Sequence, residues 1–158
     1  MDKKIVVFIV FISFILFTFF LFFYLYKENK NPPSYINLKI NNKTYKLETA
    51  KTISERSRGL SNRSELCSNC GMIFFAKSDS IQPFWMKNTL IPLDMIWVNS
   101  EGRVVHIEQA IIEENPKSPQ KIYRNTTPAK YVIELNYKET EKLNLKIGDI
   151  INVSRLNE

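Results

Sequence analysis

The chain has 158 residues, 13% of them aromatic, so it is long enough for one domain with a packed core. Its formal net charge is +6, but the basic residues are interspersed with acidic ones, which argues against a nucleic-acid-binding stripe and is typical of a solvated, mildly basic surface. The four glycines form no phosphate-cradling loop, and the sequence contains no GxSxG or HExxH motif, so the common nucleotide-binding, serine hydrolase and zinc peptidase signatures are excluded.

The N-terminal region contains an apolar run, Ile5 to Tyr26, of 22 residues without a charge. At a rise of about 1.5 Å per residue a helix of this length spans a bilayer core of roughly 30 Å. A signal peptide would have a shorter apolar core and a small-residue cleavage site, and a buried core helix would have a polar face. We therefore expect residues 1–26 to form a single uncleaved membrane anchor.

The flanking charges give the orientation of this anchor. Lys3 and Lys4 precede the run and Lys27 and Lys30 follow it, so the positive-inside count is close to a tie that the free amino terminus tips toward a cytoplasmic N-terminus. We expect a single-pass membrane protein with its soluble domain outside the cytoplasm. Residues 27–33, KENKNPP, form a short linker in which two prolines end any helix, and residues 34–158 form the β-rich domain.

Beyond the linker, short apolar runs alternate with turn residues. Two strands flank an Asn41-Asn42 turn, and Thr52 and Glu55 have the spacing of a capping box for a helix that stops near Gly59. The expected strands are 36–40, 43–47, 72–75, 93–98, 103–108, 131–135 and 150–153; the expected helical segments are 53–60 and 137–143. Many short strands and one or two short helices favour a mainly β sandwich or barrel.

Two properties of these segments matter for the site. In 131–135 the alternation places Tyr131, Ile133 and Leu135 on one face and Val132 and Glu134 on the other. Residues 110–128 are polar, contain three prolines and fit no element, so they are expected to be a lid over a site or a mobile segment.

The densest apolar run of the soluble part, FWMKNTLIPLDMIWV at 84–98, also contains polar side chains. Lysine and aspartate are seldom fully buried unless they are paired. A lysine beside a carboxylate in such a run could bind an anionic or polyhydroxyl ligand, act as an acid–base pair, or form a structural ion pair. The candidate binding residues in this run are Lys87, Asn88, Thr89 and Asp94.

Further candidates lie elsewhere in the chain. His106 is a possible ligand or proton shuttle, although a lone histidine is more often an ordinary strand residue. Arg58 at a helix end could meet a carboxylate or phosphate bidentately, and Glu134 is a candidate of the same second rank, but an ordinary exposed surface position is favoured for both. No nucleophile–base pairing is visible, so catalytic residues are not assigned.

Cys67 and Cys70 form the sole CxxC of the chain. A structural zinc site needs about four Cys or His ligands and only His106 could be added, while a thioredoxin-like centre needs a helix starting at the CxxC, where Gly71 and an apolar run follow. A small structural disulfide or two unreactive thiols are therefore expected, with no metal and no cofactor. Oxidation fits a domain outside the cytoplasm.

The run FWMKNTLIPLDMIWV, followed by SEGRVVHI, AKYVIEL and IGD, resembles the domain of unknown function family 192. The upstream segments ERSRGLSNR and CGMIFF resemble that family too, and the similarity extends over Lys46 to Val153. Ser61 departs from the family pattern, which has Met there, and the cysteines are a second departure. The resemblance implies a small jelly-roll-like sandwich, often exported or membrane-tethered, and implies no activity.

Two function classes follow from these observations. The first is a membrane-anchored binding or accessory module of the cell envelope, whose partners would be the membrane through residues 5–26 and a polar small molecule, a glycan or an envelope protein. The second is an envelope hydrolase or lyase acting on cell-surface polymers, with Lys87, Asp94 and His106 as its acid–base set. The first is favoured because no nucleophile–base pair is evident.

Overall fold

The computed structural model describes residues 3–28 and 32–156, which belong to two compact units, Met1–Pro33 and Ser34–Glu158. The first unit contains one helix, α1 (Lys3–Glu28), and its stretch Lys3–Tyr24 is long and apolar enough to cross a membrane, judged by length and composition. The predicted linker begins too early, because α1 includes Lys27 and Glu28, both good helix formers. Residues 29–31 of that linker lie outside the described part of the chain.

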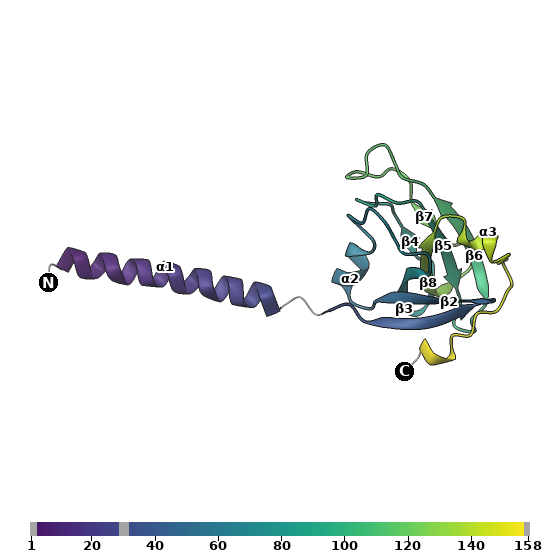
Figure 1. Cartoon of the computed structure of the whole chain (residues 1–158), viewed down its shortest axis with the longest axis horizontal. Helices are drawn as coiled ribbons and strands as arrows, with labels where there is room; N and C mark the ends of the chain where they lie inside the picture. The colour runs from purple at the N-terminus through teal and green to yellow at the C-terminus, as the bar shows by residue number, and fades with distance from the viewer. Residues whose placement is uncertain (1–2, 29–31, 157–158) are drawn as a thin grey trace. The chain divides into compact units, whose positions relative to one another are not determined.

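The second unit is built on a six-stranded sheet with the order β1-β2-β3-β8-β5-β6 (Figure 1). Its β2–β3 pair is parallel and its other pairs are antiparallel. Parallel neighbours cannot be joined by a tight turn, so the chain crosses from β2 to β3 through α2 (Ile53–Arg58). The six strands are β1 (Tyr35–Ile40), β2 (Lys43–Ala50), β3 (Cys70–Ser80), β5 (Leu93–Val98), β6 (Val104–Ala110) and β8 (Ala129–Asn136).

Local sequence signals account for several of these boundaries. The β1–β2 turn has Asn41 at φ 50°, a conformation that asparagine tolerates. At the start of α2 the Thr52 side chain accepts a hydrogen bond from the Glu55 amide, and the Glu55 carboxylate accepts one from the Thr52 amide. This reciprocal capping box confirms the predicted helix start, and the helix ends at Arg58 with Gly59 as its cap.

Both faces of the sheet are covered, which explains why β5 is buried along its whole length. One face, here called the α3 face, packs against α3 (Glu139–Lys142) and the segment 143–153 through Tyr131, Ile133 and Leu135. The other, here called the α2 face, lies under α2 and the segment 84–91 and includes Val132. The predicted alternation along β8 is therefore confirmed, and α2 and α3 lie on different sides of the strands in Figure 1.

Three expectations differ from the structure. The sandwich or barrel is not confirmed because neither sheet closes, although the mainly β character with short helices is. The predicted strand 150–153 is wrong: Ile150 makes a single isolated bridge to Arg103, and a 3₁₀ turn, η1 (Ser154–Leu156), follows. The segment 110–128 is not without structure, because β7 (Tyr123–Arg124) pairs there with β4 (Pro83–Phe84).

Candidate functional site

A cavity of about 280 Å³ opens on the α2 face. Its walls come from α2 and the residues that follow it, from Phe74 of β3, from the segment 83–89 and from Glu134 of β8. Arg58, Lys87 and Thr89, three of the residues predicted from the sequence, line this one cavity. The structure therefore brings together residues that are up to 31 positions apart in the chain, and Glu134 joins them from a further strand.

Glu134 is the buried ionisable group of this cavity, so the exposed surface position expected for it is wrong. The residue is 5% exposed, and the hydrogen bonds and ion pairs found among the described residues include none to its carboxyl group. Burial raises the pKa of the Glu134 carboxyl to about 8, although the positive charge of Arg63 acts in the opposite direction. The group is therefore mostly neutral at pH 7 and can donate a hydrogen bond into the cavity.

A second carboxylate lies on the same face but is fully engaged. Glu48, Met72 and Glu134 are in register across β2, β3 and β8, which separates Glu48 from Glu134 by one strand. Arg63 Nη2 lies 2.5 Å from Glu48 Oε2, and Arg58 Nη2 lies 3.7 Å from Oε1. The negative charge of Glu48 is thus compensated by two arginines, so Glu48 does not offset the other positive charges near Glu134.

Backbone contacts fix the position of Lys87 at the cavity rim. The hydroxyls of Ser61 and Thr89 donate to the Lys87 carbonyl oxygen at 2.8 and 3.4 Å. The Asn62 amide donates to the Asn88 carbonyl oxygen at 2.7 Å, and both asparagines have positive φ. The Asn88 amide in turn donates to Pro116 at 2.7 Å, so the polar 110–128 segment supports the loop that carries Lys87.

Asn88, a predicted binding residue, does not line the cavity; its backbone forms a turn at a position where asparagine tolerates the left-handed conformation.

Aromatic side chains form the apolar part of the cavity. Phe84 packs edge-on against Phe74 and Trp97, with ring centroids 4.9 and 6.0 Å apart. Trp97 is fully buried, whereas Trp85 is 49% exposed at the rim, where Lys87 Nζ lies 5.2 Å from its ring centroid. The cavity thus combines a charged rim with aromatic walls.

Asp94 does not belong to this cavity. Its carboxylate is fully buried on the α3 face, where it accepts hydrogen bonds from the Lys138 amide at 3.0 Å and from the amide and hydroxyl of Thr140 at 2.7 and 2.6 Å. The expected pairing with Lys87 is wrong. Successive residues of β5 point to opposite faces of the sheet, and since Met95 belongs to the α2 face, Asp94 belongs to the α3 face. In this position it fixes the start of α3.

His106 lies apart from both groups. Its ring packs against Trp97 with centroids 5.2 Å apart, and its Nε2 lies 3.6 Å from a Glu108 carboxylate oxygen. Glu108 also meets Lys121 of the 110–128 segment at 3.2 Å. Lys87, Asp94 and His106 therefore do not form one acid–base set.

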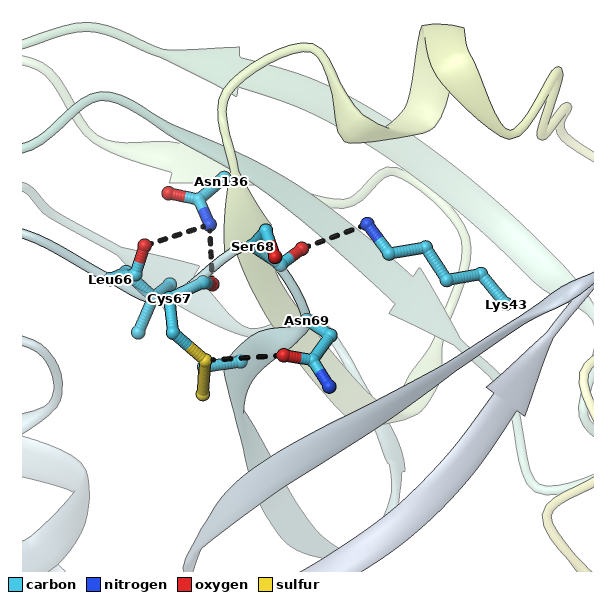
Figure 2. The surroundings of a disulfide bond; sticks show 7 residues. Lys43, Leu66, Cys67, Ser68, Asn69 and Asn136 are labelled. Atoms are coloured by element: carbon cyan, nitrogen blue, oxygen red, sulfur yellow. Dashed lines mark hydrogen bonds between the residues drawn. A yellow bond between two sulfur atoms is a disulfide. The ribbon is translucent and has the colours of Figure 1, made fainter.

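A disulfide joins Cys67 to Cys70, the first residue of β3 (Figure 2). Asn136 of β8 donates hydrogen bonds to the carbonyl oxygens of Leu66 at 3.3 Å and Cys67 at 2.9 Å, and Lys43 donates to that of Ser68 at 2.8 Å (Figure 2). A strand, not a helix, follows the CxxC, so the context differs from that of thioredoxin-like centres. Within residues 3–28 and 32–156, no group of three or more His, Cys, Asp or Glu is placed to hold a metal ion.

Sequence reasoning missed Arg56 and Trp85 as lining residues and Glu48 as the partner of Arg58 and Arg63. The only signal for Glu48 is its place in LETA, a run that continues β2 to Ala50. Arg56 donates to the Phe75 carbonyl oxygen and to Gln82 Oε1, contacts that depend on the tertiary fold.

Comparison with known proteins assigns the chain to a family. Among solved structures, a protein of unknown function from Novosphingobium aromaticivorans superposes with a TM-score of 0.68 at 27% identity, over 77% of this chain and 93% of that one. A protein from Sinorhizobium meliloti, described as a candidate transcription regulator, gives 0.64 at 31% identity, over 77% and 97%. No curated protein is significantly similar. The family model DUF192, described as Uncharacterized ACR, matches residues 36–153, and the chain therefore belongs to this family of domains of unknown function.

Proposed function

We propose that the chain is a membrane-anchored, extracytoplasmic binding or accessory domain of the cell envelope, and that its ligand site is the cavity beside Glu134. The observation that carries the proposal is the Glu134 carboxyl group, 5% exposed, turned into a cavity and without a protein hydrogen-bond partner in the described chain. The Glu134 carboxyl oxygens are not among the fully enclosed, unpartnered side-chain atoms of the described residues, so they are reached from the cavity, where a ligand can hydrogen-bond to them.

Four of the segments that carry the family resemblance support the same site. ERSRGLSNR contributes residues 56–61 to the lining, CGMIFF contributes Phe74, the 84–98 run contributes Lys87 among others, and AKYVIEL contributes Glu134. These segments are distant in sequence and meet at one cavity. A shared site is a simpler reason for that convergence than four separate structural roles.

The cellular placement rests on two supporting observations. α1 contains a stretch long and apolar enough to cross a bilayer. The Cys67–Cys70 disulfide suits an oxidising compartment, because disulfides persist mainly outside the cytoplasm. The dispersed charge gives no reason to propose a nucleic-acid partner.

An envelope hydrolase or lyase is the second candidate, because a carboxyl group with a pKa of about 8 in a cleft suits a general acid. The lining hydroxyls do not complete a catalytic pair: Ser61 and Thr89 both donate to a backbone carbonyl oxygen, and the hydrogen bonds found in the described part of the chain join the Ser57 hydroxyl to no base. Binding is therefore the better-supported function.

A thermal-shift screen of the full chain in detergent, against polar small molecules, glycans and peptides, tests the proposal. A compound that binds the native state raises the melting temperature by mass action. Ser57→Trp places a large side chain in the cavity wall and should abolish the shift, whereas Ser54→Trp, exposed on the same helix and outside the lining, should retain it. Equal shifts in both variants would show that the cavity is not the site.

A further inference from the structure

The charged groups of the cavity do not balance one another at neutral pH. Among the described residues, the charged or titratable side chains lining it are Arg56, Arg58, Lys87 and Glu134; outside the lining, Glu48 pairs with Arg58 and with Arg63. Glu134 is mostly protonated at pH 7 because its pKa is about 8. The lining therefore carries three cations and no ionised carboxylate, while Glu48 and Arg63 outside it offset one another, and the cavity has a positive potential.

Two of these cations can meet a ligand, because Arg58 is held only by a long ion pair with Glu48 and the Lys87 side chain by none in the described chain. Arg56 is held by Phe75 and Gln82, and Arg63 by Glu48. Arg58 is 59% exposed at its side chain and touches Glu48 only at 3.7 Å. Lys87 Nζ makes no hydrogen bond or ion pair within the described chain and lies over the exposed Trp85 ring.

The remaining walls set the rest of the ligand. Phe74, Phe84 and Trp85 line the cavity with aromatic surface, and about 280 Å³ is room for a single ring or a short chain. A fully hydrated ion such as free phosphate would leave this aromatic surface unused.

We infer that the ligand of this cavity is a small organic anion with a ring or short apolar group, its carboxylate or phosphate held by Lys87 and Arg58 and accepting a hydrogen bond from Glu134. This inference rests on the proposed function and names the ligand class of that same site. An uncharged sugar would satisfy Glu134 but would leave the charge of the two rim cations unmatched.

The proton on Glu134 makes the binding depend on pH. A neutral carboxyl group donates to the anion, whereas an ionised one repels it. Affinity should therefore fall as the pH rises through about 8, the pKa of Glu134 in the free protein. In Glu134→Gln the amide still donates a hydrogen bond but cannot ionise, so the affinity should stay constant through this range.

The test measures binding of benzoate, phenyl phosphate and the uncharged benzamide to the full chain in detergent by calorimetry, at pH 6.5 and 9.5. We expect benzoate or phenyl phosphate to bind at pH 6.5 at least about tenfold more tightly than benzamide, the difference expected for one charged contact. Which of the two anions binds better distinguishes a carboxylate from a phosphate ligand. Lys87→Gln should lose about tenfold in affinity, while Lys146→Gln, exposed on the α3 face, should lose none.

The outcomes distinguish a failure of the inferred ligand class from a failure of the proposed binding site. Benzamide binding as tightly as the anions, blocked by Ser57→Trp, would overturn the anionic class and keep the cavity as a site. Binding of the anions with the same affinity at both pH values in the wild type would overturn the role of Glu134. No binding of any of the three probes would overturn the inferred class, and failure of the whole thermal-shift screen would overturn the site itself.

Discussion

Glu134 occupies a position where an ionised carboxylate is disfavoured, because the residue is buried and only the charge of Arg63 opposes the desolvation. Its pKa of about 8 in the folded state lies above the ordinary value of 4.5. Between these two pH values the unfolded chain releases the proton and the folded chain retains it. The contribution of Glu134 to stability therefore falls as the pH rises from about 4.5 to about 8, and is constant beyond that.

The prediction for Glu134→Gln follows from this sign. The free energy of unfolding of the variant should increase relative to that of the wild type as the pH rises. The increase should exceed about 1 kcal/mol between pH 5 and pH 8, since one pKa unit corresponds to about 1.4 kcal/mol. Chemical unfolding at both pH values measures the difference. The exposed Glu101→Gln is the control and should track the wild type at both; a Glu134→Gln curve parallel to the wild type would show that the carboxyl group is ionised at neutral pH.

Asp94 is expected to be structural. Asp94→Asn removes an acceptor from a buried carboxylate that receives three hydrogen bonds from Lys138 and Thr140, and should cost about 1–3 kcal/mol of stability. Ligand binding in the cavity should be unchanged, because the residue lies on the α3 face. Asp79→Asn, which removes a similar but exposed contact to Ser100, should cost less. Loss of ligand binding in a folded Asp94→Asn variant would contradict the separation of the two faces.

At the scale of the element, β3 depends on a glycine at its start. A Cβ at Gly71 would lie 2.5 Å from the Glu134 carbonyl oxygen and within 2.8 Å of side-chain atoms of Leu47 and Leu135. Gly71→Ala should therefore lower the melting temperature by forcing β2, β3 and β8 apart. Gly148→Ala, where no atom lies within 4 Å but φ is 100°, should cost only the backbone strain of about 1–3 kcal/mol. Equal losses in the two variants would contradict this account of the strand packing.

Elements with strong local signals could be predicted from the sequence. The β1–β2 hairpin, the capping box of α2 and the range of β5 follow from turn residues, side-chain spacing and apolar runs that act over a few residues. The segment 150–153 has the same apolar character, yet its partners are backbone groups of residues 102 and 103 and it forms no ladder. The crossover that makes β2 and β3 parallel has no local signal either, and with it the sheet order could not be predicted.

The site was predictable in part for the same reason. Arg58, Lys87 and Thr89 could be selected by residue type and all line the cavity. The sequence could not show that Asp94 and Lys87 lie on different faces of the sheet, because that depends on where β5 begins and on the loop before it. Glu134 could be placed opposite Ile133 by alternation, but its lack of a partner follows only from which side chains reach it in the folded domain.

At the scale of the whole molecule, the proposed topology places α1 across the membrane and the β-rich unit outside the cytoplasm. A reporter fused after Glu158 distinguishes the two orientations. Alkaline phosphatase should be active in the fusion, because it requires an oxidising compartment, and a fluorescent protein that folds only in the cytoplasm should be dark. The reverse pattern would contradict the extracytoplasmic placement and leave the cavity unaffected.

The central claim, that the cavity beside Glu134 binds the ligand, is tested most directly through the two tryptophans of the chain. Trp85 is half-exposed at the cavity rim and Trp97 is fully buried. In the full chain labelled with 5-fluorotryptophan, Trp85→Phe assigns the two ¹⁹F resonances, and the compound that stabilises the wild type most is then titrated. The account predicts that the Trp85 resonance moves with saturation while the Trp97 resonance moves far less. A stabilising compound that leaves the Trp85 resonance in place would put the binding site elsewhere and contradict the account.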